Sequence, residues 1–306
     1  MFSRQQSTEV LQWQHRSRRA AKTRQARETA CDHWQYAALS ANVYDRSLSK
    51  LSTTDSFGLP PKEVTPAEAV KPNALSHWER IHFLDRLSAR ELLERGVYVE
   101  AFRTTEPFPR IAVVFEGTTG DRWSLRANAK WFLRFVPGPL IDSYSIVGST
   151  VVQKLHACLL NLGYSYDPAS QALLSPEGQT TKLVATGHSL GGGLAQYFAY
   201  TFNQAIPRNP WTEKPFLGPK VSEVFAFNTT PVTGWYAAPN PPRDHNVAGL
   251  VIHRIFEHGE VLSYIRLVTS RLIPGGQANP EIIEYRYNFL RSANIILSHS
   301  IREISE

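Results

Sequence analysis

Two spacings of apolar residues alternate along the chain, and together they predict alternating helices and strands. Short, almost continuously apolar runs are typical of strands buried on both faces of a sheet. Such runs predict strands over residues 111–115, 182–186, 221–227 and 250–256. A further strand is predicted over residues 97–103, where apolar and polar residues alternate. Longer segments with helical spacing predict helices over residues 33–44, 78–95, 122–135, 146–162 and 192–200. Residues 281–301 mix both signals.

This alternation predicts an α/β fold with a mostly parallel central sheet and helices on both faces. Residues 31–306 are expected to form a single domain, because no internal repeat or composition break divides them. Residues 1–30 form a basic segment that we expect to be helical or flexible. Stretches rich in proline, over residues 48–76, 207–220 and 231–246, predict loops.

The composition is that of a globular protein that builds a core. Hydrophobic residues make up 42% of the 306 residues and charged residues 20%, both of which are ordinary values. No apolar run reaches the roughly 18 residues of a membrane-spanning helix, and no secretory signal is recognisable. The two cysteines, Cys31 and Cys158, are too few for a disulfide framework. We therefore expect a cytoplasmic protein, or one exported by a secretion route that does not require an ordinary signal peptide.

The net charge of +6 adds one indication about partners. Part of the excess lies in residues 1–30, where arginines outnumber acidic residues. Such a segment could attract an anionic surface such as phospholipid headgroups, although a solvated arm explains the charge equally well. No nucleic-acid recognition motif accompanies the charge, so we expect no nucleic-acid partner.

The most informative stretch is Gly187–Gly191, which reads G-H-S-L-G. A predicted strand precedes it and a predicted buried helix follows it, and this context turns the pattern G-x-S-x-G into a nucleophile elbow. In such a turn the serine, here Ser189, is held in strained backbone geometry at the end of a sheet. The flanking glycines, which have no side chain, allow the neighbouring strand and helix to pack closely against the turn. The alternative is an ordinary strand-to-helix turn in which Ser189 only caps the helix.

A serine nucleophile needs a base and an orienting acid, which in this arrangement follow it in the order acid, histidine. The histidines downstream of Ser189 are His245, His253, His258 and His299. His253 falls inside a predicted strand, where we expect a packed core histidine, and His245 falls in a polar loop. His258 would come too early if Glu260 is the acid, whereas His299 lies late enough in the chain, so His299 is the predicted base.

The acid is expected just after the strand predicted over residues 250–256. Glu260 follows Gly259 and precedes an apolar pair, so its backbone could turn the carboxylate inward. Glu257 and Asp244 are the alternatives. For each of these carboxylates, an exposed position on the surface is the ordinary outcome.

An oxyanion hole completes the predicted site. One donor should be the backbone N–H of Leu190, the residue after the nucleophile, and the second should come from the loop after an earlier central strand. Thr118 stands in such a loop, directly after Gly117, and offers both its N–H and its hydroxyl. Each donor of this kind typically contributes about 3 kcal/mol to stabilising the transition state.

At these points the chain resembles the class 3, or fungal-type, lipases of the α/β-hydrolase superfamily. Gly187–Gly192 matches their elbow, G-H-S-L-G-G, and Phe115–Thr118 is similar to their oxyanion strand, F-R-G-[ST]. Residues 36–44 are similar to their N-terminal helix, and residues 254–262 align with their segment R-V-V-H-x-x-D-[IV]-[VI]. The resemblance implies an α/β-hydrolase fold over most of residues 33–302.

The resemblance also implies a function and a set of roles. Ser189 would be the nucleophile, Glu260 the acid and His299 the general base, and Thr118 and Leu190 would supply the oxyanion hole. The reaction implied is hydrolysis of a carboxylic ester in a lipid, of the phospholipase A or acylglycerol lipase type, through an acyl-enzyme. The family's chemistry needs no metal and no organic cofactor.

Some residues depart from the family pattern. Glu116 replaces the usual arginine, Glu260 replaces the usual aspartate, and Phe227–Thr229 stands where F-G-x-P is usual. These differences indicate a divergent branch, which we expect to be bacterial. Such lipases often carry an amphipathic lid, and residues 122–135 hold aromatic and cationic side chains suited to a lipid interface. An ordinary helix packed on the sheet is the alternative for this segment.

Two other functions remain open at this stage. The same three residues could serve a thioesterase, an acyltransferase or a hydrolase of small esters. The fold could also be a catalytically inactive binding module, although a scaffold has no need for a strained serine.

Overall fold

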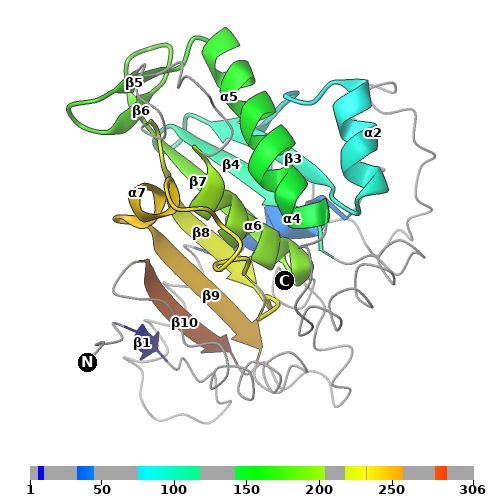
Figure 1. The fold of residues 1–306 in the computed structure, drawn as a ribbon. Coiled ribbons are helices and arrows are strands. Elements are labelled where there is room, and N and C mark those ends of the chain that lie inside the picture. The colour runs from blue at the N-terminus through cyan, green and yellow to red at the C-terminus, as the bar shows by residue number, and fades with distance from the viewer. Residues whose placement is uncertain are drawn as a thin grey trace.

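The computed structural model describes residues 6–9, 33–44, 75–117, 142–203, 218–231, 233–257 and 280–287, without the side chains of 6–9, 142, 257, 286 and 287. A ten-stranded sheet organises this part of the chain (Figure 1). Its strands are β1 (Gln6–Glu9), β2 (Glu79–Ile81), β3 (Val99–Thr104), β4 (Arg110–Phe115), β5 (Ser165–Asp167), β6 (Ala172–Leu174), β7 (Thr180–His188), β8 (Val221–Phe227), β9 (Val251–Glu257) and β10 (Glu281–Tyr287). The helices are the helix over residues 33–42, α2 (Arg86–Glu94), α4 (Asp142–Ile146), the π-helical turn η5 (Val147–Val151), α5 (Val152–Asn161), α6 (Leu190–Thr201) and α7 (Arg243–Val247).

The strands lie in the order β1-β10-β9-β8-β7-β4-β3-β2. Every neighbouring pair from β1 to β4 is parallel, and β3 and β2 extend the sheet antiparallel. The short strands β5 and β6 pair antiparallel and join the sheet at the start of β7. The predicted mostly parallel sheet is therefore confirmed. Because parallel strands end at one edge, His188, Phe227 and Glu257 close the same edge, where ligands bind in open α/β sheets.

Helices cover both faces of the sheet, as predicted. Figure 1 shows α5 and α6 in front of the sheet and the helix over residues 33–42, in blue, behind it. The central strand β4 serves both layers, because Ile111 and Val113 face the core under α5 and α6 while Ala112 and Val114 face the blue helix. All four side chains are fully buried. Burial on both sides explains why this strand is a continuous apolar run.

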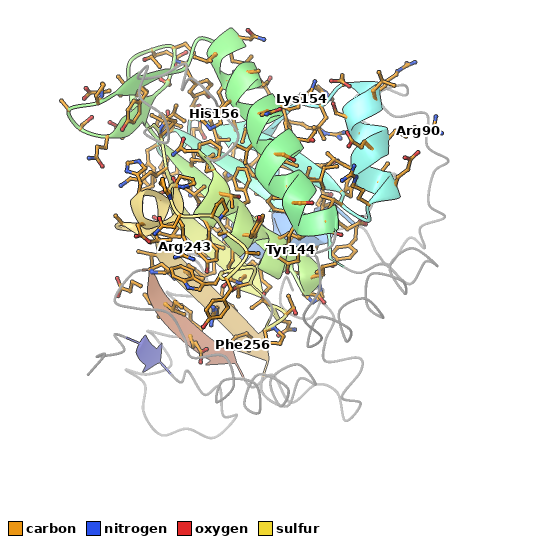
Figure 2. All side chains as sticks on the ribbon, viewed as in Figure 1. Arg90, Tyr144, Lys154, His156, Arg243 and Phe256 are labelled. Carbon is orange, nitrogen blue, oxygen red and sulfur yellow. The ribbon has the colours of Figure 1, made fainter. Side chains whose placement is uncertain are left out.

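Polar contacts tie the helices to the layers beneath them. Behind the sheet, the hydroxyls of Ser40 and Thr186 are hydrogen-bonded over 2.9 Å. On the front face, Lys154 of α5 pairs with Asp85 at 2.6 Å (Figure 2). His156, also labelled there, has its Nε2 2.9 Å from the carbonyl of Phe202 and stacks on that ring. Burial lowers the pKa of His156 to about 4, so this core histidine is neutral at pH 7.

The structure differs from the predicted elements in several places. The helix expected over 78–95 is divided, because residues 79–81 pair with β3 and the helix begins only after Asp85, whose carboxylate caps the N–H of Ser88 at 2.8 Å. Its end before Gly96 is as predicted, and Gly96 adopts a positive φ of 73°. A short helix, α7, stands in the stretch predicted as a proline-rich loop. A segment expected to be helical or flexible contains the edge strand β1, which pairs with β10.

The remainder of the basic segment 1–30 and the amphipathic segment 122–135 lie outside the described residues. Within the described ranges, no helix combines the length and the apolar character needed to cross a bilayer.

Candidate active site

Ser189 forms the turn between β7 and α6. Its backbone has φ 55° and ψ −120°, a conformation in which a residue with a side chain is strained. A helix-capping serine adopts an extended backbone and accepts a hydrogen bond from the first turn. The side chain of Ser189 makes no such capping bond. The interpretation of Ser189 as a simple helix cap is therefore wrong, and the predicted elbow geometry is present.

The glycines around Ser189 are required by close packing. A Cβ on Gly187 would lie 2.5 Å from the carbonyl carbon and oxygen of Gly191, and a Cβ on Gly191 would collide with the carbonyl oxygen of Phe115. A Cβ on Gly192 would meet the side chain of Thr229 at 2.8 Å. These contacts mean that β7, α6 and the end of β4 approach one another more closely than any side chain allows.

The end of β8 holds the serine turn from the other side. The N–H of Ser189 donates to the carbonyl of Phe227 at 2.9 Å, and the N–H of Thr230 donates to the carbonyl of Ser189 at 3.1 Å. Both backbone groups of the strained residue are thus hydrogen-bonded to one neighbouring segment. A mostly parallel sheet with such a turn at the carboxyl end of a central strand has the arrangement of an α/β-hydrolase fold.

Helix α6 directs its positive end at the serine. Leu190 is the first residue of this helix and is buried, and every residue from Leu190 to Thr201 is buried with it. Backbone N–H groups in a first helical turn have no partner within the helix. Their dipoles add to that of the helix and favour negative charge at this end. The backbone N–H of Leu190 therefore belongs to a helix terminus that can stabilise an oxyanion.

The segment that leads to Thr118 lies beside the elbow. Phe115 pairs with Gly187 across the sheet, and a Cβ on Gly117 would collide with the carbonyl oxygen of His188 and the hydroxyl of Tyr44. The chain therefore leaves β4 in direct contact with the residue before the serine. Thr118 follows at once but lies outside the described residues, so its role as an oxyanion donor stays a prediction.

Tyr44 is a residue of this site that the sequence pattern did not single out. Its hydroxyl is hydrogen-bonded to Nδ1 of His188 over 3.0 Å, and the two rings are in edge contact. Burial and the nearby Glu116 carboxylate raise the pKa of Tyr44 well above its usual value, so the phenol stays protonated. The only signal in the sequence is the position of Tyr44 at the end of the segment that resembles the N-terminal helix of fungal lipases.

The predicted acid and base follow β9 and β10, whose carboxyl ends lie at the same edge as Ser189. The N–H of Asn228 donates to the carbonyl of Ile255 at 2.8 Å, which fixes β9 beside the serine turn. Glu260, His258 and His299 lie outside the described residues, and so does the side chain of Glu257. Their position near Ser189 therefore stays a prediction.

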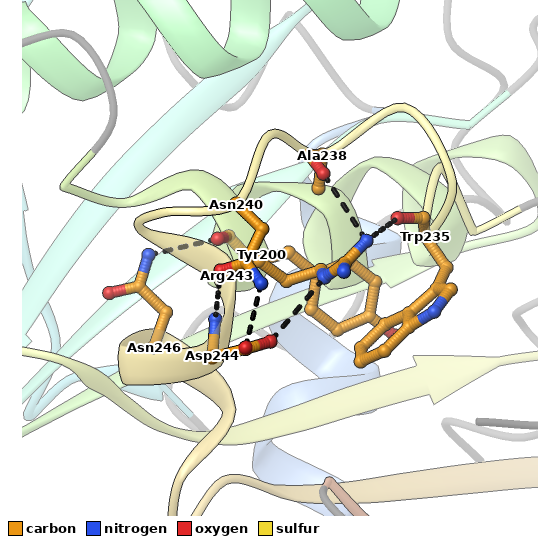
Figure 3. A network of polar contacts seen from close by, with 7 residues as sticks. All are labelled: Tyr200, Trp235, Ala238, Asn240, Arg243, Asp244 and Asn246. Atoms are coloured by element: carbon orange, nitrogen blue, oxygen red, sulfur yellow. Dashed lines mark hydrogen bonds and ion pairs between the residues drawn. The ribbon is translucent and has the colours of Figure 1, made fainter. Parts of the chain in front are cut away.

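Asp244, the other alternative acid, belongs to a separate polar network around α7 (Figure 3). Its carboxylate accepts a hydrogen bond from Nδ2 of Asn240 at 2.6 Å and lies 3.8 Å from Nε of Arg243, which sits over the ring of Trp235. Helix α7 precedes β9, whereas the elbow lies at the carboxyl end of the parallel strands. Seven residues of β9 separate the two ends by roughly 20 Å. Asp244 thus stands at the edge of the sheet opposite Ser189.

A buried glutamine in α6 is a further residue that the sequence analysis missed. Gln196 is fully buried and donates from Nε2 to the carbonyl of Gly192 at 3.0 Å. Its Oε1 accepts two hydrogen bonds from Arg254 of β9, at 2.9 and 3.2 Å. The signal was available, because Gln196 is the only amide in an otherwise apolar helix, and a buried amide requires polar partners.

The remaining downstream histidines that the structure describes lie away from the serine. The ring of His253 stacks on Phe225 at 4.6 Å and lies 5.1 Å from the ring of His33. The predicted packed histidine at position 253 is thus in an aromatic cluster behind the sheet. His245 is partly buried in α7. Across the described ranges, no group of three or more His, Cys, Asp or Glu side chains is arranged to hold a metal ion.

No protein-family model and no curated protein matches the chain. Among solved structures it is similar to a lipase of Rhizopus microsporus var. chinensis, with 14% identity and a TM-score of 0.46, over 84% of this chain and 74% of that one. It is also similar to the native propeptide complex of Rhizomucor miehei lipase, with 15% identity and a TM-score of 0.43, over 82% and 65% of the two chains. A deletion mutant of that complex gives 15% identity and a TM-score of 0.45, over 78% and 62%. The chain thus spans less than two-thirds of the length of the Rhizomucor complexes it matches.

Proposed function

We propose that this protein is a serine hydrolase that cleaves carboxylic esters of lipids, with Ser189 as the nucleophile. The observation that carries the proposal is the strained backbone of Ser189, at φ 55°, between a central strand and the first turn of a buried helix. Strain of about 1–3 kcal/mol persists only where the surroundings enforce it, and such residues cluster at active sites. Here the surroundings are glycines without room for a side chain, the carbonyl of Phe227 that accepts from Ser189, and the N–H of Thr230 that donates to it.

The proposed reaction assigns one role to each of the predicted residues. Oγ of Ser189 attacks the acyl carbonyl while His299 takes the serine proton, and Glu260 orients the imidazole and stabilises its charged form. The N–H groups of Leu190 and Thr118 bind the oxyanion. When the intermediate collapses, the imidazolium gives its proton to the leaving alcohol. Water, activated by the same histidine, then hydrolyses the acyl-enzyme and restores Ser189.

The substrate class rests on the sequence. The resemblance to fungal-type lipases supports a lipid ester, of the phospholipase A or acylglycerol lipase type. The net charge of +6 favours an anionic lipid surface, since each cation near such a surface contributes about 1 kcal/mol. We propose that residues 1–30 and 122–135 make this peripheral contact with the membrane. The proposal involves neither a metal nor an organic cofactor.

The experiment combines mixed lipid vesicles with mass spectrometry of the products, comparing wild type with Ser189→Ala. We expect the wild type to release fatty acid and the variant to release none. An alkyl fluorophosphonate should add its phosphorus to Oγ of Ser189 with loss of fluoride, and the adduct should be absent in Ser189→Ala. Turnover that survives in the variant would exclude Ser189 as the nucleophile.

The choice of acid has its own comparison. Glu260→Gln should lower kcat by orders of magnitude, as loss of the acid does in related triads, whereas Glu257→Gln should leave kcat nearly unchanged. Each of the two substitutions removes one negative charge. A general change in the electrostatic potential at the site would therefore affect both variants alike. The reverse result would assign the acid to Glu257.

A further inference from the structure

We infer that Gln196 and Arg254 form a positioning pair that holds the first turn of α6, and with it the oxyanion donor of Leu190, against the strand that leads to the acid. The inference rests on the proposed function, because it assigns these two residues a part in the same reaction. Neither residue belongs to the predicted triad or oxyanion hole. Their role is deduced from the contacts that follow.

The first turn of α6 needs external support. Gly191, Gly192 and Gly193 follow Leu190 directly, and a glycine inside a helix is less favourable than alanine by about 1 kcal/mol. The site nevertheless requires small residues there, because a Cβ at Gly191 or Gly192 would collide with β4 or with Thr229. Close packing therefore weakens the part of the helix whose backbone N–H groups are to bind the oxyanion.

Gln196 supplies that support from inside the helix. Its Nε2 donates to the carbonyl of Gly192 at 3.0 Å and lies 3.3 Å from Oγ1 of Thr229, to which it also donates. Thr229 precedes Thr230, whose N–H holds the carbonyl of Ser189. One buried amide thus joins the first turn of α6 to the segment after β8 whose Thr230 is hydrogen-bonded to Ser189.

Arg254 fixes the orientation of this amide. Its Nε and Nη2 both donate to Oε1 of Gln196, and its Nη1 lies 4.0 Å from Oε1 of Glu284 on β10. Because two N–H groups of Arg254 donate to the amide oxygen of Gln196, the amide nitrogen faces Gly192. Hydrogen bonds from a charged donor are also stronger than those from a neutral donor. Arg254 lies in β9 shortly before Glu257 and Glu260. The pair therefore links the helix of the oxyanion donor to the strand that delivers the acid.

The test compares Gln196→Met with a control variant at Asn246 of α7, a residue that contacts the C-terminal end of α6. Asn246 is fully buried like Gln196, donates to the carbonyl of Tyr200 at 2.9 Å and accepts from Nδ2 of Asn203 at 2.8 Å. Asn246→Leu removes these bonds at the C-terminal end of α6, which lies roughly 16 Å along that helix from Ser189. Both substitutions replace a buried amide by an apolar side chain of similar size. The measurements are Tm, kcat and KM for a soluble nitrophenyl ester, and the rate of phosphonylation by an alkyl nitrophenyl phosphonate.

We expect both variants to lower Tm and only Gln196→Met to slow the chemistry. Its kcat and phosphonylation rate should fall about 10- to 100-fold with KM nearly unchanged, because small misplacements of catalytic groups have effects of this size. Asn246→Leu should retain both rates. Equal rates in the two variants would overturn the inference.

A second variant covers the case in which Gln196→Met does not fold. Arg254→Lys keeps the charge beside Glu284 but cannot donate the two parallel bonds of a guanidinium. It should slow phosphonylation about tenfold, and an unchanged rate would overturn the inference. A wild-type protein that reacts with neither probe would refute the proposed function and the inference with it, whereas a reactive wild type with unaffected variants would refute the inference alone.

Discussion

The hydroxyl of Tyr44 and Nδ1 of His188 lie 3.0 Å apart, although 144 residues separate them in the chain. This hydrogen bond joins the segment after the helix behind the sheet to the residue directly before Ser189. The same hydroxyl stands where a Cβ on Gly117 would go. Tyr44 therefore fills the space between the predicted oxyanion loop and the nucleophile elbow.

Removing this hydroxyl should weaken both stability and turnover. Tyr44→Phe keeps the ring and its packing but removes the hydrogen bond, so the free energy of unfolding should fall by about 1 kcal/mol. Urea unfolding followed by tryptophan fluorescence measures the loss, and ester hydrolysis by the folded variant measures the effect on the site. A Tyr44→Phe protein as stable as wild type would show that the bond contributes nothing to the fold.

The strained serine should be replaced most favourably by glycine. Only glycine adopts φ 55° and ψ −120° with little strain, so Ser189→Gly should be more stable than Ser189→Ala by about 1 kcal/mol. Both variants lack the nucleophile and should be inactive. Paired urea titrations give the difference in stability, and an alanine variant more stable than the glycine variant would contradict the strain assigned to this residue.

Gly191 should tolerate no side chain, although its backbone is helical. Gly191→Ala would place a Cβ against the carbonyl oxygen of Phe115, so we expect a loss of stability of about 3 kcal/mol or more. Gly249→Ala is the control, because Gly249 has φ 78° but an added Cβ would meet no atom within 4 Å beyond the adjacent residues of the chain. It should cost about 1 kcal/mol through backbone strain alone. Similar losses for the two variants would refute a steric origin.

Acid should destabilise the protein through His33, which lies with His253 in the aromatic cluster behind the sheet. Burial, with the nearby His253 as a second cause, lowers the pKa of His33 to about 3, whereas an unfolded histidine titrates near pH 6.5. The unfolded chain therefore binds this proton first, so the stabilising contribution is present above pH 6.5 and is lost as pH falls toward 3. Between pH 7.5 and 5 the loss from His33 should be on the order of 2 kcal/mol.

The measurement for this prediction is the urea midpoint as a function of pH, compared between wild type and His33→Phe. Burial also lowers the pKa of His253, with Glu223 opposing and Lys182 adding to that shift. The variant should retain the part of the pH dependence that comes from His253 and from His156. An unchanged slope between pH 7.5 and 5 would exclude His33 as a source.

Much of the architecture followed from short-range patterns. The strand over 221–227 has the predicted bounds, and the apolar run 111–115 became the fully buried β4. A strand segment buried on two faces needs apolar residues at every position, which holds for residues 111–115 of β4 and for residues 224–227 of β8. The split of residues 78–95 into β2 and α2 was not predictable in this way, since it depends on pairing with β3, which a helical spacing of apolar residues does not reveal.

At the site, the motif around Ser189 predicted a serine between a strand and a helix, with glycines on either side and a strained backbone at the serine. That much follows from steric rules acting between near neighbours in the chain. The hydrogen bond between Tyr44 and His188, and the two that Arg254 donates to Gln196, became visible only in the folded chain. Each of these features depends on atoms that the folded sheet brings together from distant parts of the chain, and no local preference specifies which atoms those are.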